Sequence, residues 1–137
     1  MRKSIYLSGG MADISFEQSN KWRRYIKDEL KYEADIFNPN YYYNYEHPED
    51  FDSDAEVKRF DLHNLKQSDI VIVNFNVPGS IGTAYEVAIA ERDGKPIIGL
   101  NADHNELHPW LELACWKMFD DIDELIMYVK TYYLGGM

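Results

Sequence analysis

The sequence predicts an α/β protein with a doubly wound parallel sheet of about five strands and helices on both faces. Residues 70–73 and Phe75 form a continuous apolar run rich in β-branched side chains, typical of a central strand covered on both faces. Strand and helix patterns alternate along the chain, as in doubly wound sheets. The length of 137 residues fits one domain, residues 1–137, that buries about two-thirds of its unfolded surface.

The first predicted strand covers residues 4–7 and runs into the turn Ser8-Gly9-Gly10, where a backbone without side chains can approach a ligand. Ser15 and Gln18 then form a capping box, and apolar side chains recur at helical spacing from Trp22. This pattern predicts a strand, a glycine turn and a helix of about four turns. The turn lacks the glycine spacing of a dinucleotide fingerprint and the lysine of a Walker motif.

A second strand is predicted over residues 34–37, and the loop after it is rich in tyrosine and acidic residues. Two interpretations fit the tyrosines at positions 41, 42, 43 and 45. They form a mobile cover over a planar ligand, or they pack on their own domain or on a partner subunit.

Residues 54–67 have a helical pattern in which Val57, Asp61 and Leu65 lie on one stripe. Arg59 and His63 are not at positions three or four residues away, so neither forms an intrahelical ion pair with Asp61. The pattern therefore predicts a carboxylate that points toward the core.

A second unusual carboxylate follows the central strand. After the turn at residues 78–80, the predicted helix 83–90 is apolar almost all round apart from Glu86. We expect protein to cover this helix on all sides, which would deprive Glu86 of water. The alternative is a structural role near the helix start, where a negative charge favours the helix dipole.

The rest of the chain completes the alternation. Residues 93–96 predict a helix stop, 97–100 a fourth strand, 111–116 a short helix, 117–119 a short fifth strand and 122–134 an amphipathic final helix.

Composition excludes several classes of protein. A formal net charge of −10 argues against binding a nucleic acid polymer. A single cysteine excludes an internal disulfide, and there is neither a signal-peptide pattern nor a run of 18 apolar residues. We therefore expect a cytoplasmic protein with no membrane partner. His104 and His108 are four residues apart, but Pro109 interrupts a helix there and no third ligand is well placed, so no metal is expected.

In open α/β sheets, ligands bind at the carboxyl ends of the strands where the strand order switches. Tyr6, Asp61 and Glu86 are expected to meet there. Two carboxylates without a metal or a thiol suit cleavage of a bond to an anomeric carbon, in which one attacks and the other manages a proton. A phenol beside the attacking carboxylate can fix its rotamer.

Three segments carry a resemblance to a known family: IYLSGGM with Tyr6, FDLHNLKQSD with Asp61, and GSIGTAYEVAIA with Glu86, followed by GKPII. They resemble the nucleoside 2-deoxyribosyltransferase family and the related 2'-deoxynucleoside 5'-phosphate N-hydrolase, over nearly the whole chain. The resemblance implies a flavodoxin-like sheet, no cofactor, Glu86 as a nucleophile that forms a deoxyribosyl ester, and Asp61 handling the proton on the base. It also implies a homodimer or higher homo-oligomer whose sites are completed by a neighbouring subunit.

This chain differs from members of the family at two places. The transferases carry an acidic residue where this chain has Ser80, whereas the hydrolases place a serine there and use it, with the following glycine, on the 5'-phosphate; Ser80 and Gly82 would take those parts. The hydrolases also carry arginines in the first glycine turn, where this chain has Met11 and no arginine. The resemblance further implies that His108, next to Pro109 and Trp110, reaches a neighbour's site, where its cation would meet a phosphate; the alternative is a histidine on the surface.

The residues implied to contact substrate are Ser8, Gly9, Gly10, Met11, Ser80, Gly82, His108 and Trp110. The expected activity is cleavage of the N-glycosidic bond of a deoxynucleoside or deoxynucleotide, with transfer of the sugar to a free nucleobase. A hydrolase that acts on the 5'-monophosphate is the alternative within this class. A nucleotide-binding sensor without turnover and a structural oligomer are alternatives from other classes.

Overall fold

The structure is a computed structural model that describes residues 2–11, 14–51 and 53–135. Its five strands are β1 (Lys3–Gly9), β2 (Ala34–Phe37), β3 (Ile70–Asn74), β4 (Ile97–Leu100) and β5 (Lys117–Phe119). They form one all-parallel sheet in the order β2-β1-β3-β4-β5. The predicted α/β class and flavodoxin-like sheet are confirmed, including the short fifth strand.

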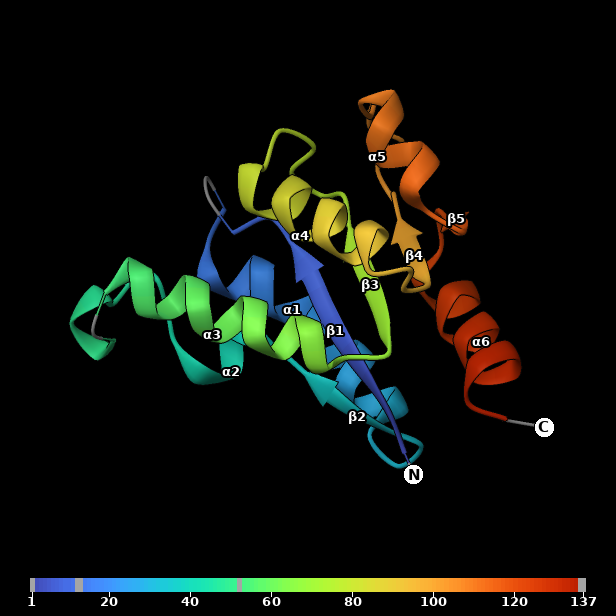
Figure 1. Ribbon diagram of the computed structural model, residues 1–137, viewed down its shortest axis with the longest axis horizontal. Coiled ribbons are helices and arrows are strands. Elements are labelled where there is room, and N and C mark those ends of the chain that lie inside the picture. Colours follow the sequence, from blue (N-terminus) through green and yellow to red (C-terminus); the bar gives the residue numbers. More distant parts are fainter. Residues whose placement is uncertain (1, 12–13, 52, 136–137) are drawn as a thin grey trace.

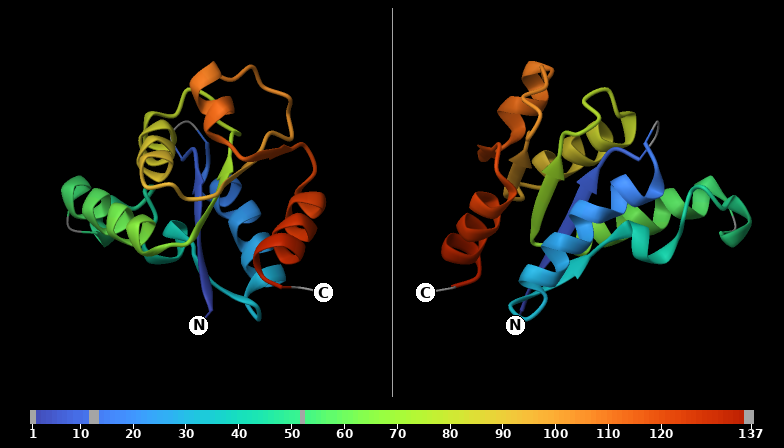
Figure 2. Two further views of the ribbon diagram at one scale, coloured as in Figure 1. Left: turned by 45° about the vertical axis from the view of Figure 1, so that its right-hand side comes forward. Right: turned by 180° about the vertical axis from the view of Figure 1, so that it is seen from behind.

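Helices cover both faces of the sheet (Figures 1 and 2). On one face lie α1 (Phe16–Leu30) and α6 (Ile122–Tyr133); on the other lie α3 (Asp54–Gln67), α4 (Ile81–Arg92) and α5 (Pro109–Ala114). Two short helices, α2 (Pro39–Tyr42) and the 3-10 helix η1 (Pro48–Asp50), connect β2 to α3. In the described part of the chain, none of the helices has the length and apolar character needed to cross a membrane.

Alternation along β1 decides which side chains reach which face. Ile5 and Leu7 belong to the core under α1 and α6, whereas Tyr6 belongs with Val71 to the core under α3 and α4. Successive side chains of a strand point to opposite faces, so Ser8 shares the face of Tyr6. Two hydroxyl groups therefore point toward α4 from one strand.

Side-chain caps fix where the helices begin. The predicted capping box of α1 is present: the Ser15 hydroxyl accepts from the Gln18 amide at 3.1 Å, and the Gln18 side chain accepts from the Ser15 amide at 3.1 Å. Ser53 caps α3 and Ser80 caps α4 in the same manner, each accepting from an amide three residues on. These contacts satisfy amides that lack partners within a helix.

The expectation that protein covers α4 on all sides is wrong. Only Thr83, Val87 and Ala90 are buried, whereas Ala88 is exposed and Ile81 is 83% exposed. The helix lies on the sheet with one face, and no described residue covers its outward face. An apolar composition therefore did not mean that the helix is buried all round: in the isolated chain only one of its faces is covered.

Close packing explains both glycines of the first turn. A Cβ at Gly9 would lie 2.7 Å from Cζ2 of Trp22, and a Cβ at Gly10 would lie 2.4 Å from Cβ of Val77. Both distances are shorter than any ordinary contact between carbon atoms. The turn is thus held against α1 on one side and against the segment before α4 on the other.

We predict that Gly10→Ala lowers the free energy of unfolding by about 1–3 kcal/mol, because Val77 meets the new methyl group close to its own backbone. Gly79→Ala is the matched control, since no atom lies within 4 Å of a Cβ there. Urea unfolding followed by circular dichroism measures both. Equal stability of Gly10→Ala and the wild type would contradict the packing argument.

Candidate active site

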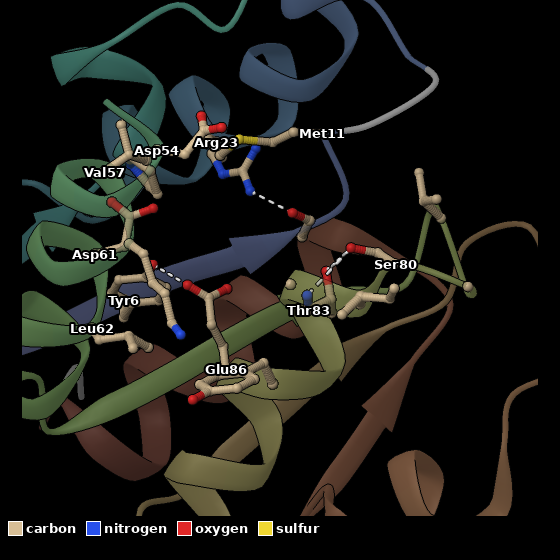
Figure 3. A pocket seen from close by; sticks show the side chains of 18 residues that line it. Tyr6, Met11, Arg23, Asp54, Val57, Asp61, Leu62, Ser80, Thr83 and Glu86 are labelled. Carbon is tan, nitrogen blue, oxygen red and sulfur yellow. Dashed lines mark hydrogen bonds between the residues drawn. The ribbon is translucent and has the colours of Figure 1, made fainter. Parts of the chain in front are cut away.

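A cavity of about 870 Å³ opens at the carboxyl ends of β1 and β3, between α3 and α4 (Figure 3). Its wall includes Gly9 and Met11 of the first turn, Arg23 of α1, and residues from α3 and from the segment 77–86. This is the position at which parallel α/β sheets bind ligands, because the strand order switches between β1 and its two neighbours.

Glu86 lies in the second turn of α4 and points back toward β1. The Tyr6 hydroxyl donates a hydrogen bond to Oε2 of Glu86, and the Ser8 hydroxyl donates to Oε1 at 2.7 Å. Tyr6 and Ser8 are almost completely buried, at 0% and 1% exposure. Both oxygens of one carboxylate are therefore held by hydroxyl groups two residues apart on one strand.

Opposing effects act on the charge of Glu86. Burial holds the pKa of Glu86 above its ordinary value, although the hydrogen bonds from Tyr6 and Ser8 and the charge of Arg23 act to lower it. Burial and the neighbouring charge of Glu86 also raise the pKa of Tyr6, so its phenol remains a neutral donor. Hydrogen bonds to the ionised form are what make a carboxylate tolerable in such a place.

Asp61 projects from the middle of α3 into the same cavity (Figure 3). The Tyr43 hydroxyl donates to its Oδ2, and its Oδ1 is buried with no hydrogen-bond partner among the described residues. Burial raises the pKa of Asp61 to about 7; the Tyr43 hydrogen bond opposes this shift and the charge of Glu86 adds to it. Near neutral pH this carboxyl group can hold a proton and release it.

Two of the tyrosines after β2 contact their own chain closely, although Tyr42 is 54% exposed and Tyr41 is 72% exposed. Tyr43 is buried, and the ring of Tyr42 stacks on Phe37 at 5.2 Å and meets the edge of Phe60 at 5.0 Å. Packing on the same domain is thus the interpretation that the structure favours over a mobile cover.

The predicted site residues divide into three groups. Those that line the cavity are Tyr6, Gly9, Met11, Asp61, Ser80, Gly82 and Glu86. Ser8 lies beneath Glu86, and Gly10 packs on Val77. His108 and Trp110 lie at the start of α5, outside the cavity of their own chain, where His108 Nδ1 accepts from the Trp110 amide at 3.2 Å.

The start of α4 forms one end of the cavity. The Ser80 hydroxyl accepts from the Thr83 amide at 3.2 Å and lies 3.0 Å from the Thr83 hydroxyl. No atom lies within 4 Å of a Cβ at Gly82, so the backbone at the start of α4 is open on that side. Among the residues that the structure describes, no group of three or more His, Cys, Asp or Glu could hold a metal ion.

Sequence reasoning missed Arg23, and it missed that Tyr43 donates to Asp61. Arg23 lies beside Trp22 and three residues before Ile26, so the buried stripe of α1 could have identified it as an inward-facing cation. Tyr43 carried no such signal, because neighbouring tyrosines surround it in the sequence.

Comparison with protein-family models and with curated protein sequences finds no match. Comparison with solved structures finds a conserved protein from Enterococcus faecalis V583, with a TM-score of 0.79 and 14% identity over 96% of this chain and 99% of that one. A 2-deoxyribosyltransferase from Bacillus psychrosaccharolyticus gives a TM-score of 0.71 and 20% identity over 90% of each chain. A CMP N-glycosidase from Clostridium botulinum gives a TM-score of 0.67 and 21% identity over 95% of this chain and 99% of that one. At these identities the likeness establishes a shared fold.

We predict that Asp61 makes stability depend on pH. Its folded pKa of about 7 lies above its ordinary value of 3.8, so between these values the native state binds more protons than the unfolded chain. Between about pH 4 and 7, Asp61 ionises in the unfolded chain but keeps its proton in the native state, so the free energy of unfolding falls as the pH rises. Asp61→Asn removes this loss, and its advantage over the wild type should grow across that range to on the order of 1–3 kcal/mol.

Urea unfolding at a series of pH values measures this difference, with Asp103→Asn, at an exposed position, as the control. A difference curve for Asp61→Asn that stays flat between pH 4 and 7 would show that the Asp61 carboxyl ionises normally.

Proposed function

We propose that this protein cleaves the N-glycosidic bond of 2'-deoxyribonucleosides or their 5'-monophosphates through a deoxyribosyl ester on Glu86, and transfers the sugar to another nucleobase. The observation that carries the proposal is a pair of carboxyl groups in one cavity with different environments. Glu86 is held through both oxygens, while the pKa of Asp61 is raised to about 7. Two proteins that share the fold are a 2-deoxyribosyltransferase and a CMP N-glycosidase, which supports the same class of reaction.

In the proposed reaction, one oxygen of Glu86 bonds to C1' of the sugar while the bond from C1' to the base nitrogen breaks. The bonding electrons leave with the base, which receives the proton of Asp61. A nitrogen of the second base then attacks C1', Glu86 departs as a carboxylate, and Asp61 recovers a proton from the incoming base. Tyr6 remains neutral and fixes the rotamer of Glu86 throughout.

Hydrolysis of a 5'-monophosphate is a second candidate, in which water replaces the incoming base. It is favoured by the open start of α4, where Ser80 and Gly82 line the cavity opposite the acids, because helix starts bind phosphate well. The choice between the two acceptors depends on how well the occupied cavity excludes water.

We predict that Glu86→Gln abolishes turnover, with a loss of at least about 10³-fold, because an amide cannot form the ester. Glu91→Gln, an exposed substitution on the same helix, is the control and should keep the wild-type rate. The assay incubates each protein with deoxynucleosides and deoxynucleotides, with and without a second free base, and separates the products by chromatography. Exchanged base indicates transfer, and free base alone indicates hydrolysis.

Mass spectrometry of quenched wild-type protein should also detect a deoxyribosyl adduct that Glu86→Gln lacks. Wild-type rates in Glu86→Gln would refute the nucleophile assignment. Binding of these compounds without any turnover would favour the nucleotide sensor instead.

We also propose that the protein forms a homo-oligomer whose sites are shared between subunits. Large apolar side chains are exposed at the start of α4 and on α5: Ile81 at 83%, Trp110 at 80% and Leu113 at 79%. Exposed side chains of this size support contact with another copy of the chain. His108 lies at the start of α5 and would reach the cavity of the neighbouring subunit.

We predict that two inactive variants restore activity when their subunits are mixed. His108→Asn keeps a side-chain acceptor for the cap of α5 but loses the imidazole. In a twofold dimer, random mixing of this variant with Glu86→Gln should recover about a quarter of the wild-type activity. A monomer in sedimentation equilibrium, or an active His108→Asn protein, would contradict the shared site.

A further inference from the structure

Arg23 is a cation enclosed beneath the cavity. It is 0% exposed and comes from α1, on the opposite face of the sheet from Glu86. Its guanidinium donates to four acceptors: Leu7 O at 3.2 Å, Gly9 O at 3.0 Å, Ser19 O at 2.7 Å and Asn40 Oδ1 at 2.7 Å. The guanidinium also lies over the ring of Trp22, 4.7 Å from its centroid.

The topology of the sheet explains why these acceptors need Arg23. The amide and carbonyl of Ser4 face β3, so the carbonyls of Leu7 and Gly9 point to the opposite edge of β1. The pairing with β2 ends where Phe37 lies opposite Tyr6. Beyond that point, Arg23 takes the place of the missing strand and supplies the donors that buried carbonyls require.

The charge of Arg23 has no ion pair within the described residues. All four of its acceptors are neutral, and the carboxylates Glu86 and Asp61 line the same cavity as Arg23. Burial lowers the pKa of Arg23 to about 10, while the charge of Glu86 raises it, so the guanidinium stays charged at neutral pH. In a medium of low dielectric such a charge acts over longer distances than at the surface.

We propose that Arg23 is a positioning residue for the reaction: its enclosed charge favours the ionised form of Glu86, and its hydrogen bonds hold the carbonyls on either side of Ser8. The role of Arg23 in catalysis rests on the proposed function, whereas its effect on the ionisation of Glu86 does not. Ser8 supports Oε1 of Glu86, so a shift of the strand at positions 7–9 would withdraw that support.

The titratable groups that face Glu86 come from four segments of the chain. They are Tyr6 on β1, Arg23 on α1, Tyr43 after α2, and Asp54, Lys58 and Asp61 on α3. Lys58 is exposed, with its Nζ 4.8 Å from the centroid of the Tyr85 ring, so solvent screens its charge more than that of Arg23.

The test is a carboxyl ¹³C NMR titration of Glu86, assigned with Glu86→Gln as the blank. In Arg23→Gln the titration midpoint of Glu86 should rise by about one pH unit or more, a tenfold change in its ionisation constant. Arg23→Lys, which keeps a cation, should show a smaller rise. Arg24→Gln changes the exposed neighbour on α1 and should leave the midpoint unchanged.

A second measurement needs no substitution at Arg23. The Nε resonance of Arg23 should shift with pH in the wild type with the midpoint of Glu86, and Glu86→Gln should lose this component of the shift. This measurement decides the matter should Arg23→Gln fail to fold. A flat Arg23 resonance in the wild type, or an unchanged Glu86 midpoint in folded Arg23→Gln, would overturn the proposal.

Kinetics then separate this inference from the proposed function. The acid limb of kcat/KM should move to higher pH in Arg23→Gln together with the NMR midpoint, an effect that a purely structural arginine would not produce. If the wild type turns over none of the deoxynucleosides and deoxynucleotides, the proposed function fails, while the two titrations still establish or refute the charge coupling.

Discussion

The Glu86 carboxylate, lodged against two hydroxyl groups of β1, is the contact on which the arrangement of the site depends. An ionised carboxylate loses much of its hydration there, and only donors that are already in place can compensate. Tyr6 and Ser8 supply these donors because side chains two residues apart on a strand share a face. The position of α4 over the end of β1, fixed by the order β2-β1-β3, brings Glu86 to them.

Most of the fold could be predicted because its signals are local. The apolar run of β3, the capping box at Ser15 and the helix stop before β4 each act over a few residues, and the structure has all three. How much of α4 is buried could not be predicted in the same way. Composition shows that a helix is apolar all round, but the number of elements that reach it depends on the whole topology, and here its outer face is open.

The same distinction runs through the site. Glu86 and Asp61 were visible in the sequence because a carboxylate among apolar neighbours is a local anomaly, and both line the cavity. Tyr43 and Arg23 act across the fold, through hydrogen bonds to residues 14 to 18 positions away. Arg23 and Arg24 are identical neighbours in the sequence, and only the phase of α1 makes one buried and the other exposed.

A reaction with one attacking and one protonating carboxyl group needs the two groups to ionise differently at the same pH. Burial raises the pKa of both, so burial alone cannot separate them. What differs is the number of donors: Glu86 receives two hydroxyl groups, whereas Asp61 receives one and has a buried oxygen without a partner among the described residues. Each additional donor to the charged form favours ionisation. The unequal supply of hydroxyl groups therefore supports the proposal that Glu86 is the nucleophile and that Asp61 is the group that holds a proton.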